Sequence, residues 1–229
     1  MKDPFIVTGC ARSGTSMTAG IINICGAFGG DMFGPNSYNQ KGMFENKIIR
    51  QDISKPYLRK IGADPLGQKP LPNNRQIFEV SPNEIKEFRT RIVLAIQNQG
   101  YIDGPWFYKG AKACLVWYMW HRAFPTAKWV IVRRDTSDII DSCLRTRFMK
   151  AYNTSEGWKG WVEEHKKRFS EMNIAGLDTF EFWPSQILDG DILHMRNLME
   201  FLALDYDNNS RMIEAFIDPK LYRRKANGC

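Results

Sequence analysis

Short apolar runs alternate along the chain with longer amphipathic segments. Mostly apolar runs between turn-forming residues are typical of buried strands, and they occur at 5–9, 106–109, 128–133 and 179–183. Segments with apolar residues at helical spacing lie between or after them, at 14–25, 46–60, 82–99, 113–121, 136–149, 158–172 and 191–202. Because strands that alternate with helices build parallel sheets, we predict an α/β fold with a central, mainly parallel β-sheet flanked by helices on both faces.

The segments between these elements carry turn-forming residues. Residues 26–46 are rich in Gly, Asn and Pro and are expected to form a loop, and several prolines make 61–80 irregular. Within the amphipathic segment 158–172, the charged run 165–168 is interpreted as a solvated helix face. The 229 residues show neither an internal repeat nor a clean domain boundary, so we expect a single domain over 1–229.

Composition narrows the class of protein without choosing a function. Hydrophobic residues make up 43% of the chain, and no run approaches the roughly 20 apolar residues of a membrane span. Met1–Pro4 leads directly into the first strand, which leaves no room for a signal peptide. The five cysteines are an odd number without metal-type spacing, which favours reduced thiols and a cytoplasmic location. The net charge of +7 fits an anionic ligand, a nucleic acid or a membrane surface.

The most informative motif is a glycine-containing loop directly after the first strand, within Phe5–Met17. It resembles the nucleotide-binding P-loop pattern G-x-x-x-x-G-K-[ST], in which backbone N–H groups bind phosphates and the Lys reaches the terminal ones. Gly9 and Gly14 keep the spacing, but Thr15 replaces the Lys and the nearest cation is Arg12. We therefore expect a P-loop-like sheet whose loop binds a 5′-phosphate-type anion without the lysine of ATP and GTP enzymes.

A second candidate anion site follows the strand at 128–133. Arg134 ends the strand, and Ser142 lies eight residues on, about two turns into the next helix. Alone, this stretch is interpreted as an ordinary helix start that Thr136 or Ser137 caps. Together with a phosphate loop at another strand, it indicates two separated anion sites, as a nucleotide phosphorylated at both ends requires.

These two motifs together resemble those of the sulfotransferase superfamily, whose members use 3′-phosphoadenosine 5′-phosphosulfate (PAPS). In that family a [KR]-S-G-T-[ST] loop binds the 5′-phosphosulfate, and an Arg followed eight positions later by a Ser binds the 3′-phosphate. The resemblance is clear over 5–46 and 106–145 and implies a site without a metal ion. It also implies the cofactor-binding residues, which are Arg12, Ser13, Gly14, Thr15, Ser16, Arg134 and Ser142.

The same resemblance implies catalytic residues. The segment 42–46 resembles a G-x-F-E-N loop of bacterial and phage-type members, which makes Glu45 the candidate general base. The alternative is a surface carboxylate that caps the following helix. Lys109 matches the first residue of the family's Lys-Asp-Pro-Arg and would face the transferring sulfuryl group, with Lys112 at the Arg position. The alternative for Lys109 is a solvated lysine, and Arg12 would offset charge on the 5′-phosphosulfate.

Other positions depart from the family or stay open. Met17 stands where the family has an aromatic residue that stacks on adenine. The basic residues Arg223, Arg224 and Lys225 either contact the 3′-phosphate or belong to a frayed tail. A set of tryptophans fits the core better than an acceptor pocket, and its members are Trp117, Trp120, Trp158 and Trp161.

We therefore expect in-line, metal-independent transfer of a sulfuryl group from PAPS to a hydroxyl or amine of a small molecule, carbohydrate or other acceptor. The product would be adenosine 3′,5′-bisphosphate. A P-loop-type nucleoside or small-molecule kinase is the alternative enzyme, and it requires a loop lysine and bound Mg²⁺. We expect no nucleic-acid partner, because the chain lacks a helix-turn-helix, RRM or zinc-finger pattern. A sulfotransferase-like module that binds the cofactor without turnover stays open.

Overall fold

The sheet is parallel throughout the part of the chain that the structure describes. The structure, a computed structural model, describes residues 1–222. Its four-stranded sheet has the order β2–β1–β3–β4, with β1 (Phe5–Gly9), β2 (Phe107–Lys109), β3 (Lys128–Val132) and β4 (Thr179–Phe182). Gly9 pairs with Val132 and Val7 with Lys109, so the carboxyl ends of β1, β2 and β3 lie at one edge. The predicted α/β fold is confirmed.

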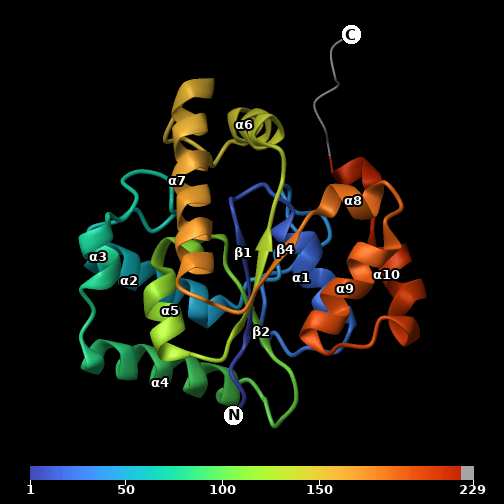
Figure 1. Cartoon of the computed structure of the whole chain (residues 1–229), viewed down its shortest axis with the longest axis horizontal. Coiled ribbons are helices and arrows are strands. Elements are labelled where there is room, and N and C mark those ends of the chain that lie inside the picture. Colours follow the sequence, from blue (N-terminus) through green and yellow to red (C-terminus); the bar gives the residue numbers. More distant parts are fainter. Residues whose placement is uncertain (223–229) are drawn as a thin grey trace.

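Helices cover both faces of the sheet (Figure 1). One face carries α2 (Lys55–Lys60), α3 (Asn74–Phe78), α4 (Pro82–Asn98), α5 (Trp117–Ala123) and α7 (Ser155–Ile174). The other carries α1 (Thr15–Ile24), α9 (Ile192–Leu202) and α10 (Ser210–Phe216). At the carboxyl edge, β3 leads into α6 (Thr136–Arg145) and β4 into α8 (Pro184–Leu188). Shorter turns are the π-helical η1 (Ile49–Ser54) and the 3₁₀-helical η2 (Ala111–Val116), η3 (Asp207–Asn209) and η4 (Pro219–Leu221).

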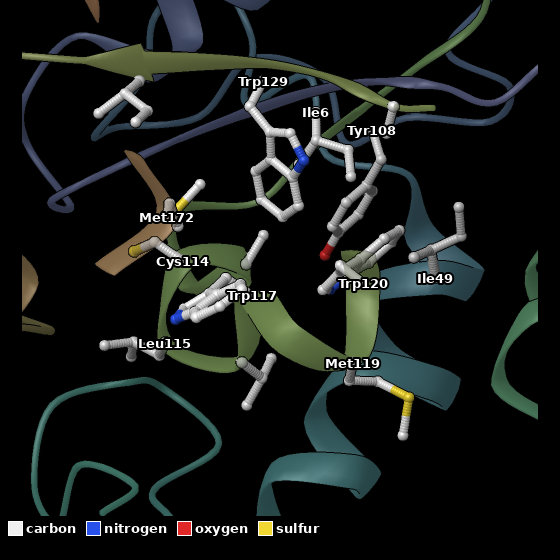
Figure 2. Packing of buried hydrophobic residues seen from close by; sticks show 14 of the residues in the cluster. Ile6, Ile49, Tyr108, Cys114, Leu115, Trp117, Met119, Trp120, Trp129 and Met172 are labelled. Atoms are coloured by element: carbon white, nitrogen blue, oxygen red, sulfur yellow. The ribbon is translucent and has the colours of Figure 1, made fainter. Parts of the chain in front are cut away.

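Neighbouring strand residues supply two hydrophobic cores, because successive side chains of a strand point to opposite faces. Trp129 of β3 belongs to one core and Val130 to the other. The core of Trp129 is strongly aromatic, and Figure 2 shows Tyr108 lying on the ring of Trp120, with ring centroids 4.7 Å apart. The interpretation of the tryptophans as core residues is confirmed for Trp117, Trp120 and Trp158.

Two predicted helices have different boundaries in the structure. The helix predicted for 46–60 begins at η1, because Asn46 stays in the loop and its Oδ1 accepts a hydrogen bond from the Ile49 N–H at 3.1 Å. The helix predicted for 136–149 ends as α6 at Arg145, since Thr146 has an extended backbone. Both differences place polar loop residues, rather than helix, beside the carboxyl edge of the sheet.

The sequence analysis missed three short helices. The segment 61–80, expected to be irregular, contains α3, whose capping box joins Asn73 and Gln76. The helices α8 and α10 were not predicted, and α8 begins with Pro184 at its first position. Helices this short have little periodicity to detect, because they span less than two turns.

The interpretation of 165–168 as a solvated face is wrong for His165 and Arg168, which are 1% and 3% exposed. Both continue the buried stripe of α7, whose members recur at intervals of three and four residues. The other members of this stripe are Trp158, Trp161, Val162, Phe169 and Met172. The helical spacing, rather than the local charge, decides which side of α7 faces the protein.

Gly9 is a position where the fold tolerates no side chain. Its φ is +150°, and a Cβ there would lie 2.5 Å from the carbonyl oxygen of Val132. Gly9→Ala is therefore expected to lower the free energy of unfolding by about 2–4 kcal/mol, through backbone strain and collision with β3. Gly26→Ala is the control, since Gly26 also has a positive φ, +90°, but no atom within 4 Å of the added Cβ. Its expected loss is about 1 kcal/mol, and equal losses in urea unfolding would contradict the prediction.

Candidate active site

A cavity of about 580 Å³ opens at the carboxyl edge of the sheet. Arg12 follows β1, Lys109 ends β2, and Arg134 follows β3, so the parallel register brings three cations from distant segments to its wall. The structure brings together most of the predicted site residues, and those that line this cavity are Arg12, Gly14, Thr15, Ser16, Glu45, Lys109, Arg134 and Ser142. Ser13 lies beneath the wall and is fully buried.

The loop between β1 and α1 has the geometry of an anion site. Gly14 adopts a left-handed conformation with φ of 104°, and α1 begins after it without a side-chain cap. The N–H groups of the first turn of a helix have no intrahelical partner, so they are available to an anion. The Oγ of Ser13 is buried and finds no hydrogen-bond acceptor or donor among residues 1–222. A bound phosphate oxygen would satisfy both the N–H groups and this hydroxyl.

The two anion motifs meet in the structure. Arg12 Nε donates a hydrogen bond to Ser142 Oγ at 3.1 Å, and Arg134 Nη1 donates to the carbonyl oxygen of Arg12 at 2.8 Å. Asp138 lies 3.6 Å from Arg134 Nε on the next turn of α6, and the guanidinium lies over the ring of Tyr222, 4.4 Å from its centroid. The side chains that the sequence predicted for the 5′ and 3′ phosphates therefore form one connected group.

Glu45 is the centre of a buried ion-pair cluster. Lys109 Nζ donates to Glu45 Oε1 at 2.8 Å, with both side chains about as buried as the core, and Arg50 pairs with Oε2. Burial raises the pKa of Glu45, but the charges of Lys109, Lys112 and Arg50 outweigh it and lower the pKa to about 2. The alternatives of a surface carboxylate and a solvated lysine are thus wrong for Glu45 and Lys109.

The loop that carries Glu45 is held to the rest of the fold by its polar atoms. Ser16 Oγ donates to the Met43 carbonyl at 3.3 Å, which ties the loop to the first turn of α1. The Phe33 N–H donates to the Glu45 carbonyl at 2.9 Å. Asn46 Nδ2 donates to the Gly29 carbonyl at 2.9 Å inside the protein. These contacts explain why an Asn follows Glu45, and they fix the carboxylate opposite Lys109.

The structure adds site residues that sequence reasoning missed. Arg50 pairs with Glu45, and its only signal in the sequence is that it follows Glu45 by five residues. His165 and Trp161 line the cavity from α7, and the period of the buried stripe is the signal that would have identified them. Met17, the departure from the family's aromatic residue, also lines the cavity. The basic residues 223–225 lie outside the described residues.

Two further features bear on the class of protein. Within residues 1–222, no cluster of three or more His, Cys, Asp or Glu side chains has the arrangement of a metal site. Over the same residues, no helix combines the length and the apolar character needed to cross a membrane.

The buried ion pairs make stability depend on the ionisation of Glu45. Because its pKa is lowered, the carboxylate stabilises the fold fully above the unfolded value of about 4.5 and loses this contribution as the pH falls toward about 2. We expect Glu45→Gln to cost about 3 kcal/mol at pH 7, since it leaves Lys109 and Arg50 unpaired, and much less at pH 3. Urea unfolding at the two pH values measures this.

Glu84 provides the control, because a lysine and Ser81 lower its pKa to a similar value at the surface. Solvent screens such exposed pairs, so Glu84→Gln should cost less than about 1 kcal/mol at either pH. A loss at Glu45 that is equally small, or independent of pH, would contradict the buried pairing.

The fold resembles those of solved bacterial sulfotransferases. Sulfotransferase STF9 from Mycobacterium avium superposes with a TM-score of 0.58 at 14% identity, covering 93% of this chain and 67% of that one. The sulfotransferase domain of the Synechococcus PCC 7002 olefin synthase gives 0.56 at 14% identity, covering 91% and 77%. STF1 from Mycobacterium tuberculosis H37Rv gives 0.50 at 14% identity, covering 97% and 73%. No protein-family model and no curated protein matches the sequence. The fold of this chain is therefore that of the sulfotransferase superfamily.

Proposed function

We propose that this protein is a sulfotransferase that moves a sulfuryl group from PAPS to an acceptor hydroxyl or amine. The observation that carries the proposal is the connection of the two anion motifs, in which Arg12 bonds to Ser142 and Arg134 to the backbone of Arg12. A nucleotide with phosphate groups at its 5′ and 3′ positions needs two such motifs, whereas ATP needs only the first. The likeness in fold to bacterial sulfotransferases supports the same conclusion.

The residues present fit the two charged ends of PAPS. The uncapped first turn of α1, the orphaned Ser13 hydroxyl and Arg12 would hold the 5′ end, with Thr15 and Ser16 as further hydroxyl donors.

At the 3′ end, Arg134 and Ser142 supply a cation and a hydroxyl. Asp138 keeps the guanidinium of Arg134 oriented at the cavity wall.

When bound, PAPS supplies an activated sulfuryl group and leaves as adenosine 3′,5′-bisphosphate. Lys109 and Arg12 would offset the negative charge that grows on the 5′-phosphate as its bond to sulfur breaks. Glu45 would take the proton of the acceptor on a carboxylate oxygen as the new bond to sulfur forms. The site would thus supply two cations for the leaving group and one carboxylate for the proton, which balances the charge that moves.

The ion pairs make Glu45 a weak base, since its pKa is held at about 2. A hydroxyl becomes a much stronger acid as its oxygen bonds to sulfur, so a weak carboxylate base is sufficient late in the transfer. The same ion pairs hold the carboxylate in one place. Glu45 would therefore have two roles, proton acceptor and anchor of Lys109.

The kinase alternative has less support. Thr15 occupies the position of the P-loop lysine, and Glu45 is already paired with Lys109 and Arg50 rather than free to hold Mg²⁺. Arg134 and Ser142 would also have no task in a kinase that binds ATP, because ATP lacks a 3′-phosphate.

The cofactor class is tested by calorimetry with adenosine 3′,5′-bisphosphate and with ADP, each with and without Mg²⁺. We expect the bisphosphate to bind more tightly than ADP and independently of Mg²⁺, and Arg134→Ala to weaken it by at least about 30-fold, since a charge-assisted phosphate contact is lost. The control is Arg133→Ala, because Arg133 pairs with Glu181 at 3.0 Å, outside the cavity lining. Equal binding of ADP, or a need for Mg²⁺, would overturn the proposal.

The role of Glu45 is tested by the release of adenosine 3′,5′-bisphosphate from PAPS, with 4-nitrophenol as acceptor. We expect Glu45→Gln to lower kcat by about 100-fold or more, because the proton acceptor is removed. Binding of the bisphosphate should persist, since Lys109 keeps its charge. Asp218→Asn is the control, because Asp218 lines the same cavity and caps Lys220. Activity that survives in Glu45→Gln would remove Glu45 as the base.

A further inference from the structure

The cavity continues from the charged residues to a wall of different chemistry. We call this the inner wall, and it consists of Gly67, Phe148, Met149, Trp161 and His165. Trp161 and His165 come from the buried stripe of α7, and the other three from the loops after α2 and α6. It contrasts with the phosphate loop because two aromatic rings, a thioether and one imidazole replace the arginines and lysines.

The tautomer of His165 follows from its contacts. Its Nδ1 lies 2.8 Å from the carbonyl oxygen of Trp161, one turn earlier on α7. A carbonyl oxygen only accepts hydrogen bonds, so Nδ1 carries the proton and Nε2 carries a lone pair. Burial lowers the pKa of His165 to about 4, and nearby Arg168 acts in the same direction. The imidazole is therefore neutral near pH 7, with Nε2 as an acceptor.

The other polar groups near the inner wall are already paired. Trp161 Nε1 donates to the Gly67 carbonyl at 2.9 Å, and Gln68 bonds to Phe148 and Lys150 through both ends of its amide. Among residues 1–222, no group forms a hydrogen bond with Nε2 of His165. An acceptor on a side chain that is 99% buried, at a cavity wall and without a partner, is costly unless a ligand supplies a donor.

His165 and Glu45 serve different parts of the cavity. The charges that lower the pKa of Glu45 belong to Lys109, Lys112 and Arg50, whereas the charge that acts on His165 belongs to Arg168. A ligand group at His165 is therefore not the group that Glu45 would deprotonate.

We propose that Nε2 of His165 accepts a hydrogen bond from a second hydroxyl of an aromatic acceptor, whose ring lies against Trp161, Phe148 and Met149. This inference rests on the proposed function and names its acceptor class, phenols that carry another hydroxyl group. His165 is a specificity-determining residue in this scheme. A buried acceptor left unpaired disfavours an analogue without the second hydroxyl, which is how polar sites reject such analogues.

Matched pairs of small phenols test the inference without turnover. Resorcinol and 3-methoxyphenol differ only in a methyl group on the second oxygen, as do hydroquinone and 4-methoxyphenol. Calorimetry measures the binding of each to the full chain, with and without adenosine 3′,5′-bisphosphate. We expect the diol of at least one pair to bind about tenfold more tightly than its ether. His165→Phe should abolish this preference, while His121→Phe, which alters a histidine outside the cavity lining, should preserve it.

A spectroscopic measurement on the unaltered protein covers the case in which His165→Phe fails to fold. Long-range ¹H–¹⁵N correlation of the three histidines should show one buried imidazole protonated at Nδ1. Its Nε2 signal should shift when the preferred diol is added and stay in place with the matched ether. A proton on Nε2 of that imidazole in the free protein would overturn the inference.

The outcomes separate this inference from the proposed function. Equal binding of diol and ether, no binding of any of the four phenols, or a preference that survives in His165→Phe would each overturn it. Bisphosphate binding is measured separately, so it can succeed while the phenols fail. If the diol preference appears without any bisphosphate binding, the inner wall is supported and PAPS is overturned as the donor.

Discussion

The parallel pairing of β1 with both β2 and β3 is the constraint on which the site depends. Parallel strands end at the same edge, so residues that follow them meet there even when more than a hundred positions separate them. In this register Gly9 lies beside Val132, so close that no side chain fits, and Val7 lies beside Lys109. A slip of one residue would turn Lys109 to the other face of the sheet and break its contact with Glu45.

Charge balance explains how so many cations coexist at this edge. Glu45 neutralises part of the charge of Lys109 and Arg50, and Asp138 does the same for Arg134. The remaining positive charge, together with the open N–H groups of α1, exceeds what the protein itself satisfies. Such an excess is stable only when solvent or an anion compensates it, which is the physical basis of the anion site.

Helix α7 links the core to the site. Its buried stripe includes Trp158, which packs in the core, and His165, which reaches the cavity wall. Because Trp161 is held by the Gly67 carbonyl and His165 by the Trp161 carbonyl, the rings are fixed by the same contacts that fix the helix. The shape of the inner wall is therefore set by the packing of α7, not by the phosphate loop.

The sequence by itself determined the parallel α/β fold, the long elements and the phosphate loop, because each depends on local signals such as apolar period, glycine spacing and turn residues. It also placed Arg12, Glu45, Lys109, Arg134 and Ser142 in the candidate site by motif. Only the tertiary structure decided that Arg50 pairs with Glu45, that Arg12 bonds to Ser142, and that His165 is buried at the cavity. The physical reason is range: periodicity and turn chemistry act over a few residues, whereas these pairings require strands and helices distant in the chain to pack first.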